Sequence, residues 1–318
     1  MRKVFLLIVI YNKTSFEKRN DFQKLKQALF FILFTFALLN AQNQKKQELD
    51  SLFQEIKNSK TDTSKILIYN EISRYYLYKN STIGFKYAEK SLELSKKNNW
   101  KKGLGISFKN LGMHTISLGK YELASKYFAI SEKYLKNIED KQYLAGLYNQ
   151  IGILKANKGD FANSLDYFFK SLQLYESAKI INQSLVAAIY ENIGTVYNFS
   201  NEYDKAIVNY KKAIIRYKKS KFKEVATAQA ITNLGIVYQK KGFLKLALIQ
   251  YNLANEILKV HKSDFAMGFN LSWIGSALLV QNQFKISIEK SKLAITFVEK
   301  TGDKELLATT LQNLGNCF

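Results

Sequence analysis

The stretch Glu191–Ala213, ENIGTVYNFSNEYDKAIVNYKKA, contains a pattern that the chain repeats. We take Gly194 as the anchor of this pattern. Aromatic and small residues follow it at fixed offsets, at Tyr197, Tyr203, Ala206, Tyr210 and Ala213. The same offsets from a second anchor, Gly235, give Tyr238, Leu244, Ala247, Tyr251 and Ala254. Repetition with a period of about 40 residues is typical of a solenoid.

Further anchor glycines, each preceded by an aliphatic residue, mark the other copies. The anchors are spaced 40 to 42 residues apart, at Gly112, Gly152, Gly194, Gly235, Gly275 and Gly315. A degenerate first copy, one residue out of register, is centred on Ile72 and Ser73. The last copy is interrupted where the given sequence ends, at Phe318. The sequence therefore predicts about six complete repeats and the beginning of a seventh.

The residue types in the repeat predict a pair of closely packed helices. We give each position as an offset, the number of residues after the anchor. Glycine at the anchor and alanine or serine at offset 12 allow the two helices to approach closely, because the separation of packed helices depends on the side chains at the contact. Aromatic residues at offsets 9 and 16 fill the surrounding space, and the small residue at offset 19 is expected to admit the next repeat. Glycine or asparagine tolerates the left-handed conformation that ends a helix. These residues stand seven positions after each anchor, at Gly119, Gly159, Asn201, Gly242 and Asn282.

This ladder of small and aromatic residues resembles the tetratricopeptide repeat over residues 66–318. The period of 40 to 42 residues is longer than the usual period of about 34, and the closing proline is missing because the chain contains none. The resemblance implies an all-α, right-handed α-solenoid of antiparallel helix pairs, a superhelix of a long-period, exported bacterial type. We expect residues 42–65 to form an N-terminal capping helix and linker, because such arrays need polar-backed caps.

Residues 1–41 have the features of a leader. Lys24 and Lys26 precede an apolar run at 28–39, and Ala41 follows it. A basic region, an apolar core and a small residue are typical of a secretory signal peptide, and the run is shorter than the roughly 20 residues that span a bilayer. We therefore expect an exported protein, periplasmic or membrane-associated. An uncleaved N-terminal anchor and, if the leader is not functional, a cytoplasmic protein are the alternatives.

Residue types that commonly act in catalysis or metal binding are few in this sequence. Cys317 is the only cysteine, which excludes an intrachain disulfide. His114 and His261 lie in different repeats without a second ligand at helical spacing, and we expect both at the surface or in the groove. No metalloprotease, CxxC or phosphate-loop motif occurs. We therefore expect no enzymatic activity, no cofactor and no metal.

The formal net charge of +22 favours acidic partners. Lysines gather near the predicted helix ends, as at 218–223, where cations interact favourably with the helix dipole. The aromatic residues are committed to the repeat, so the alternation of bases and aromatics expected of a nucleic-acid groove is missing. We do not expect nucleic acid, and we expect membrane contact only through the leader or a segment beyond residue 318. The alternative is a basic solenoid that binds polyanions or an anionic membrane surface.

A carboxamide stands two residues before most anchors, at Asn110, Gln150, Asn192, Asn233 and Asn313, with Trp273 as the interruption. An amide both donates and accepts, and so matches the backbone of an extended peptide. In the family that the chain resembles, asparagine near this position clamps the ligand backbone, which implies that role for these residues. Neighbours one helical turn away are expected to tune the site, at Glu191, Thr195, Asn198, Thr232, Ile236 and Gln239. The alternative is that the amides only bond neighbouring helices.

The sequence thus predicts a non-catalytic scaffold whose concave face binds a protein or an extended peptide. Exported arrays of this kind often form the sensing or interaction part of a bacterial signal transduction protein. The repeat breaks off inside a first helix, so we interpret the sequence as a fragment or as a gene product that lacks its natural C-terminus. The favoured context is a receptor in which a membrane span and an output module follow, and the alternative is a free-standing scaffold.

Overall fold

The computed structural model describes residues 42–318 apart from 78, 179, 180, 222 and 262. The proposed leader, residues 1–41, lies outside the described part. All regular structure in the described part is helical.

One helix precedes the repeats, and the remaining helices alternate as first and second members of pairs. The leading helix is α3 (Gln42–Asn58). The first members are α4 (Asp62–Tyr75), α6 (Lys101–Ser117), α8 (Gln142–Asn157), α10 (Gln183–Phe199), α12 (Glu224–Lys240), α14 (Asp264–Val280) and α16 (Lys304–Gly315). The second members are α5 (Ser81–Lys97), α7 (Tyr121–Leu135), α9 (Phe161–Glu176), α11 (Tyr203–Lys218), α13 (Leu244–Val260) and α15 (Phe284–Val298), which the 3₁₀ turn η1 (Glu299–Thr301) follows. The described part therefore holds six helix pairs and the first helix of a seventh, as the anchor spacing predicts.

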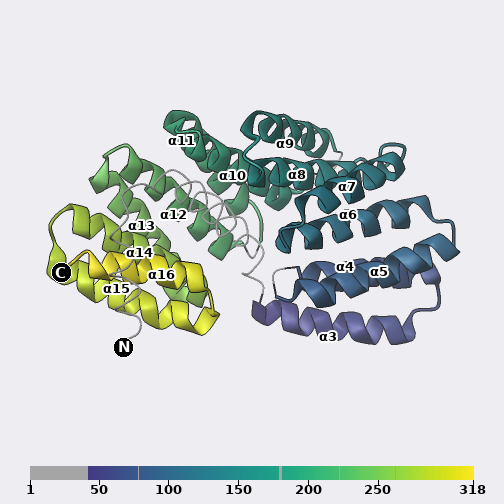
Figure 1. Ribbon diagram of the computed structural model, residues 1–318, viewed down its shortest axis with the longest axis horizontal. Coiled ribbons are helices and arrows are strands. Elements are labelled where there is room, and N and C mark those ends of the chain that lie inside the picture. The colour runs from purple at the N-terminus through teal and green to yellow at the C-terminus, as the bar shows by residue number, and fades with distance from the viewer. Residues whose placement is uncertain (1–41, 78, 179–180, 222, 262) are drawn as a thin grey trace.

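The pairs stack into a curved array with an inner and an outer layer. First helices of successive repeats contact one another, whereas each second helix packs on its own first helix and on the next one. The array forms an arch in which α10 and α12 lie on the inside, and α9 and α11 on the outside (Figure 1). At one end α3 packs on α4, where Leu49 joins Ile68 and Ile72. The first helices therefore form the inner wall of the arch.

Each of the five anchor glycines from Gly112 to Gly275 lies against the residue 16 positions later in its own repeat. A Cβ atom built on Gly112 would lie 2.3 Å from a ring carbon of Phe128, and one built on Gly235 would lie 2.5 Å from the ring of Tyr251. The small residue at offset 12 is fully buried in the same crossing. Where it is Ser164, its hydroxyl donates to the carbonyl of Gly152 at 2.8 Å. The close helix approach that the sequence predicts is therefore present.

The small residue at offset 19 forms an additional contact within its own repeat where it is a serine. Ser131 donates to the carbonyl of Gly105 at 2.7 Å, and Ser171 donates to that of Ala145 at 2.7 Å. Both acceptors belong to the first helix of the same repeat. In these two repeats the serine therefore ties the far end of its own helix pair as well as leaving room for the following one.

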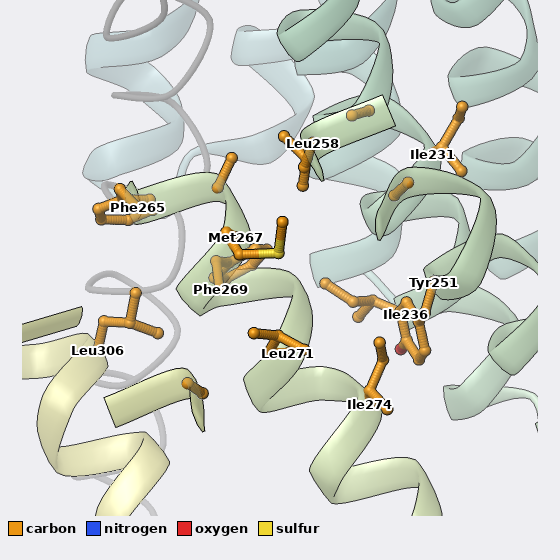
Figure 2. Packing of buried hydrophobic residues seen from close by; sticks show 14 of the residues in the cluster. Ile231, Ile236, Tyr251, Leu258, Phe265, Met267, Phe269, Leu271, Ile274 and Leu306 are labelled. Carbon is orange, nitrogen blue, oxygen red and sulfur yellow. The ribbon is translucent and has the colours of Figure 1, made fainter. Parts of the chain in front are cut away.

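Aromatic and aliphatic side chains fill the space between consecutive pairs. Around α12, α13 and α14 the buried side chains include Ile231, Tyr251, Leu258, Phe269 and Leu271, which lie close together in Figure 2. Leu306 of α16 is part of the same cluster. Since the cluster joins residues of several pairs, the hydrophobic core is continuous along this part of the array.

The turns inside the pairs use the left-handed residues that the sequence predicts. Gly119, Gly159 and Gly242 have φ values of 72°, 79° and 82°, and Asn201 and Asn282 both have 60°. This conformation ends the first helix and starts the return, because glycine and asparagine reach it at little steric cost.

Candidate binding site on the first helices

The carboxamides that precede the anchors lie on the inner layer, mostly within the packing. Asn110, Asn192 and Asn233 are buried, whereas Gln150 and Asn313 are partly exposed. Buried polar groups almost always form hydrogen bonds. The partners of these amides therefore show what holds them in place.

Four of the five amides obey one rule. Each amide donates a hydrogen bond to the side chain that stands three residues before the anchor of the previous repeat. The hydrogen bond therefore joins two successive first helices. The bonds run from Asn110 to Asn70 Oδ1 at 2.9 Å, from Asn192 to Asn149 Oδ1 at 3.1 Å, from Asn233 to Glu191 Oε1 at 3.0 Å and from Asn313 to Ser272 Oγ at 3.2 Å. We call this set the amide ladder. In the amide ladder the amides connect neighbouring helices, as the alternative interpretation expects. Their role in peptide binding stays a prediction.

The amide ladder is interrupted at two places. At the anchor Gly275 the amide is replaced by Trp273, and there the hydroxyl of Thr232 donates instead to Asn270 Oδ1 at 3.0 Å. At the anchor Gly152 the residue three positions before the preceding anchor is Lys109, whose ammonium has no lone pair to accept a bond. The side chain of Gln150 forms no hydrogen bond within the described residues.

The expected tuning residues are also tied into the inner layer. Thr195 shares a 2.9 Å hydrogen bond with the Tyr210 hydroxyl, and Lys240 donates to Asn198 Oδ1 at 3.0 Å. Gln239 donates to Ser276 Oγ at 3.1 Å and accepts from Tyr251 at 2.9 Å. Ile236 is buried in the core. Of this group, Gln239 alone is partly exposed.

Glu191 is a buried carboxyl inside the ladder. The Tyr217 hydroxyl donates to one of its oxygens at 2.9 Å, and Asn233 donates to the other. Burial raises its pKa to about 7, although the two donated hydrogen bonds act in the opposite direction. Its protonation state therefore changes near neutral pH.

His114 is buried, which corrects the expectation that it lies at the surface or in the groove. It is 1% exposed, and its Nε2 lies 2.9 Å from Ser73 Oγ, one repeat earlier. Gly84 on α5 leaves room for the ring, because a Cβ there would lie 2.1 Å from it. Burial is the main cause that lowers the pKa of His114 to about 4. With Ser73 fully buried, this serine–histidine pair has no exposed atom to offer a substrate.

Lys109 is a polar residue of the inner wall that the sequence analysis missed. It is partly buried on α6, and burial together with the nearby Arg74 lowers its pKa to about 8, while Glu71 acts in the opposite direction. A Cβ placed on Gly146 would lie 3.6 Å from its Nζ and 3.2 Å from the Tyr175 hydroxyl. The signal was available, since the residues three positions before the anchors are otherwise able to accept hydrogen bonds.

The described part offers few signs of other kinds of site. No cluster of three or more metal-binding side chains occurs among the described residues. None of the described helices is both long and apolar enough to cross a membrane.

The comparison with known families decides what the repeats are. Residues 143–219, which run from α8 to the end of α11, match a family model described as the tetratricopeptide repeat. The chain carries tetratricopeptide repeats. The tetratricopeptide array is also 29% identical over 105 residues to the Photosystem I assembly protein Ycf3 of Prochlorococcus marinus subsp. pastoris, a match that covers 33% of this chain and 54% of that protein. The chain thus spans about half the length of the curated relatives that it matches.

Solved structures share the architecture of the tetratricopeptide array. The APC/C hetero-tetramer Cut9–Hcn1 superposes with a TM-score of 0.64 at 14% identity, covering 96% of this chain and 57% of that one. A Rap protein complexed with Competence and Sporulation Factor superposes with a TM-score of 0.60 at 13% identity, covering 93% and 85%. At these identities the similarity establishes the fold.

Proposed function

We propose that the tetratricopeptide array is a non-catalytic scaffold that binds an extended peptide segment of a protein along its inner wall. The observation that carries this proposal is a set of partly exposed polar side chains on three of the first helices, α8, α12 and α14. They are Asn149, Gln150, Gln239 and Ser276. Their amides and hydroxyls can both donate and accept, which suits a peptide backbone regardless of its sequence.

The similar proteins support a role in handling other proteins. Ycf3 is named as an assembly protein, and the Rap protein was solved in complex with a factor. On the basis of these similar proteins we propose for this chain the general role of an interaction scaffold. The more specific proposal is that the array is the sensing or interaction part of an exported bacterial signalling protein.

Site-specific photo-crosslinking tests the location of binding. The full chain is first screened against an array of random decapeptides, and a photoreactive benzoylphenylalanine is then placed at Gln150 or Gln239 on the inner wall. Exposed positions on the outer second helices, Lys133 and Lys211, serve as matched controls. We expect bound peptides to be captured from the inner positions only. Capture from the outer positions, or failure of every peptide to bind, would refute the proposal.

A further inference from the structure

The outer side of α13 exposes aliphatic side chains along the length of the helix. Leu246, Ile249, Leu253 and Val260 are 43%, 58%, 46% and 73% exposed. They stand 11, 14, 18 and 25 residues after the anchor Gly235. Because a helix turns by about 100° per residue, these offsets lie on the opposite side of the helix from the buried residues at offsets 12, 16 and 19. The four side chains therefore point away from the contact of α13 with α12.

The two neighbouring second helices extend this apolar surface. On α11, Val208 and Ile215 are 51% and 55% exposed. On α15, Ile286 and Leu293 are 43% and 44% exposed. They stand at offsets on the same outer side of the helix, 14 and 21 on α11 and 11 and 18 on α15. We call these eight aliphatic side chains of α11, α13 and α15 the outer patch.

The repeat itself does not require apolar residues at these positions. Single apolar side chains are normal on a protein surface, but a set shared by three consecutive helices indicates a contact. On α9 the same outer offsets hold polar side chains, at Asn163, Asp166, Lys170 and Gln173. The outer patch is therefore a property of the later repeats that folding of the helix pair does not explain.

The helices that carry the outer patch are strongly basic. Together α11, α13 and α15 contain ten Lys and Arg residues but three Asp and Glu residues. Two of the three acids, Asp204 and Glu256, are paired with lysines at 2.6 and 2.7 Å. Several exposed lysines around the patch form no ion pair with any described residue. They are Lys211, Lys218, Lys219, Lys245, Lys285 and Lys292. The charge of these lysines is therefore available to an anionic partner.

The residue types favour a lipid surface over a protein partner. Protein interfaces are enriched in aromatic residues and Arg and depleted in Lys, and their hot spots seldom use Leu or Val. The outer patch instead combines Leu, Ile and Val with Lys, which is typical of helices that lie in a membrane interface. The stem of a lysine can cover apolar surface while its ammonium reaches a phosphate. A second copy of the chain would bring the same excess of positive charge and would repel the first.

We propose that the outer patch docks the array on the surface of an anionic lipid membrane. The aliphatic side chains enter the interface between headgroups and acyl chains, and the surrounding lysines contact the lipid phosphates. The contact is peripheral, and it leaves the inner wall free because the patch lies on the opposite layer of the arch. This inference goes beyond the proposed function and does not depend on it.

Co-sedimentation of the full chain with lipid vesicles tests the apolar part of the patch. The vesicles are made of phosphatidylcholine alone or with about one third phosphatidylglycerol, which supplies the negative surface charge. The variant Ile249→Ser with Leu253→Ser is compared with Leu123→Ser with Phe169→Ser, which changes exposed apolar residues on the outer helices α7 and α9. All of these positions are exposed, so the variants should fold, and every variant keeps residues 1–41, so the comparison isolates the patch.

We expect the wild type to bind the anionic vesicles and to bind the neutral ones much more weakly. Ile249→Ser with Leu253→Ser should lower the affinity by roughly 10- to 100-fold, since two half-exposed side chains together bury about as much surface as one whole aliphatic side chain. The control pair on α7 and α9 should change it by less than about twofold. In addition, a photoreactive benzoylphenylalanine at Leu253 should crosslink to lipid, whereas one at Phe169 should not.

A pair of lysine substitutions tests the electrostatic part. Lys245→Gln with Lys292→Gln should lower the affinity by roughly 10- to 30-fold at low salt, because each lysine near an anionic surface contributes about fivefold. Lys126→Gln with Lys133→Gln removes the same charge from the outer side of α7 and should change the affinity by less than about threefold. Raising the salt concentration should weaken the binding of the wild type and reduce the difference between these variants.

Equal losses in the patch variants and their controls, or equal binding to neutral and anionic vesicles, would overturn the proposal. Two other results would overturn it by showing a different occupant. Self-association in sedimentation velocity that Ile249→Ser with Leu253→Ser abolishes would show that the patch joins two copies of the chain. Retention on polyglutamate that requires Lys245 and Lys292, without binding to vesicles, would show that the surface recognises an acidic polymer. Each of these outcomes leaves peptide binding by the inner wall to its own test.

Discussion

Replacing the anchor glycines by alanine, one repeat at a time, tests the contact that determines the fold. The six positions share one offset but differ in what an added methyl group would meet. At Gly112 the nearest atoms are two ring carbons of Phe128, at 2.3 and 2.6 Å, and at Gly194 they are those of Tyr210, at 3.1 Å. At Gly315 nothing lies within 4 Å. The series therefore varies the crowding while it keeps the substitution constant.

Two opposing effects set the expected magnitude. Alanine is favoured over glycine in a helix by about 1 kcal/mol, and overfilling a well-packed core costs about 1–3 kcal/mol. Phe128 is 1% exposed and cannot turn away into solvent. We therefore expect Gly112→Ala to lower the free energy of unfolding by about 1–2 kcal/mol. Gly194→Ala should be nearly neutral, and Gly315→Ala should stabilise α16 by up to about 1 kcal/mol.

Urea unfolding followed by circular dichroism, together with hydrogen exchange of the amides of α6 and α7, measures these effects repeat by repeat. Local exchange is needed because long arrays do not always unfold in one step. A Phe128→Leu change should recover part of the loss at Gly112, which a double-mutant cycle reports as coupling. If Gly112→Ala proved as stable as Gly315→Ala, the ring contact would not be the reason for glycine at the anchor.

Three further predictions concern the polar groups of the first helices. The pKa of His114 is lowered from 6.5 to about 4 in the folded chain, so its contribution to stability, up to roughly 3 kcal/mol, is present above pH 6.5 and lost as the pH falls towards 4. In urea titrations, the difference in the free energy of unfolding between the wild type and His114→Gln should therefore change with pH within this window and stay constant outside it. The pKa of Glu191 is raised to about 7 in the folded chain, so its contribution to stability is complete below pH 4.5 and is lost as the pH rises through 7. The variant Glu191→Gln should remove this pH dependence from the hydrogen exchange of the amides in α10. Asn233→Ala should cost about 1–3 kcal/mol in urea unfolding, because it leaves one oxygen of Glu191 without its donor, whereas the exposed Lys211→Ala should change little.

Periodicity in the sequence was sufficient to predict the architecture. The anchor spacing predicted six helix pairs and the start of a seventh, and the glycine or asparagine at offset 7 predicted the left-handed turns. These features are local, since a helix ends where a residue can reach positive φ and packs closely where side chains are small. Because each repeat contacts only its neighbours, a correct prediction for one repeat also holds for the other repeats.

The candidate site depended on contacts between repeats, which one copy of the pattern does not contain. The burial of His114 requires Ser73 and Gly84, the former 41 residues away, and the sequence placed this histidine at the surface. The carboxamides were visible in sequence, but whether each is free or bonded depends on the residue three positions before the preceding anchor. Sequence alone thus determined the solenoid and the row of amides. Only the stacking of the repeats decided which polar groups of the inner wall form hydrogen bonds and which, such as Lys109 and Gln150, form none with the residues that the structure describes. The physical reason is that hydrogen bonds between side chains about 40 residues apart exist only once the helices are side by side.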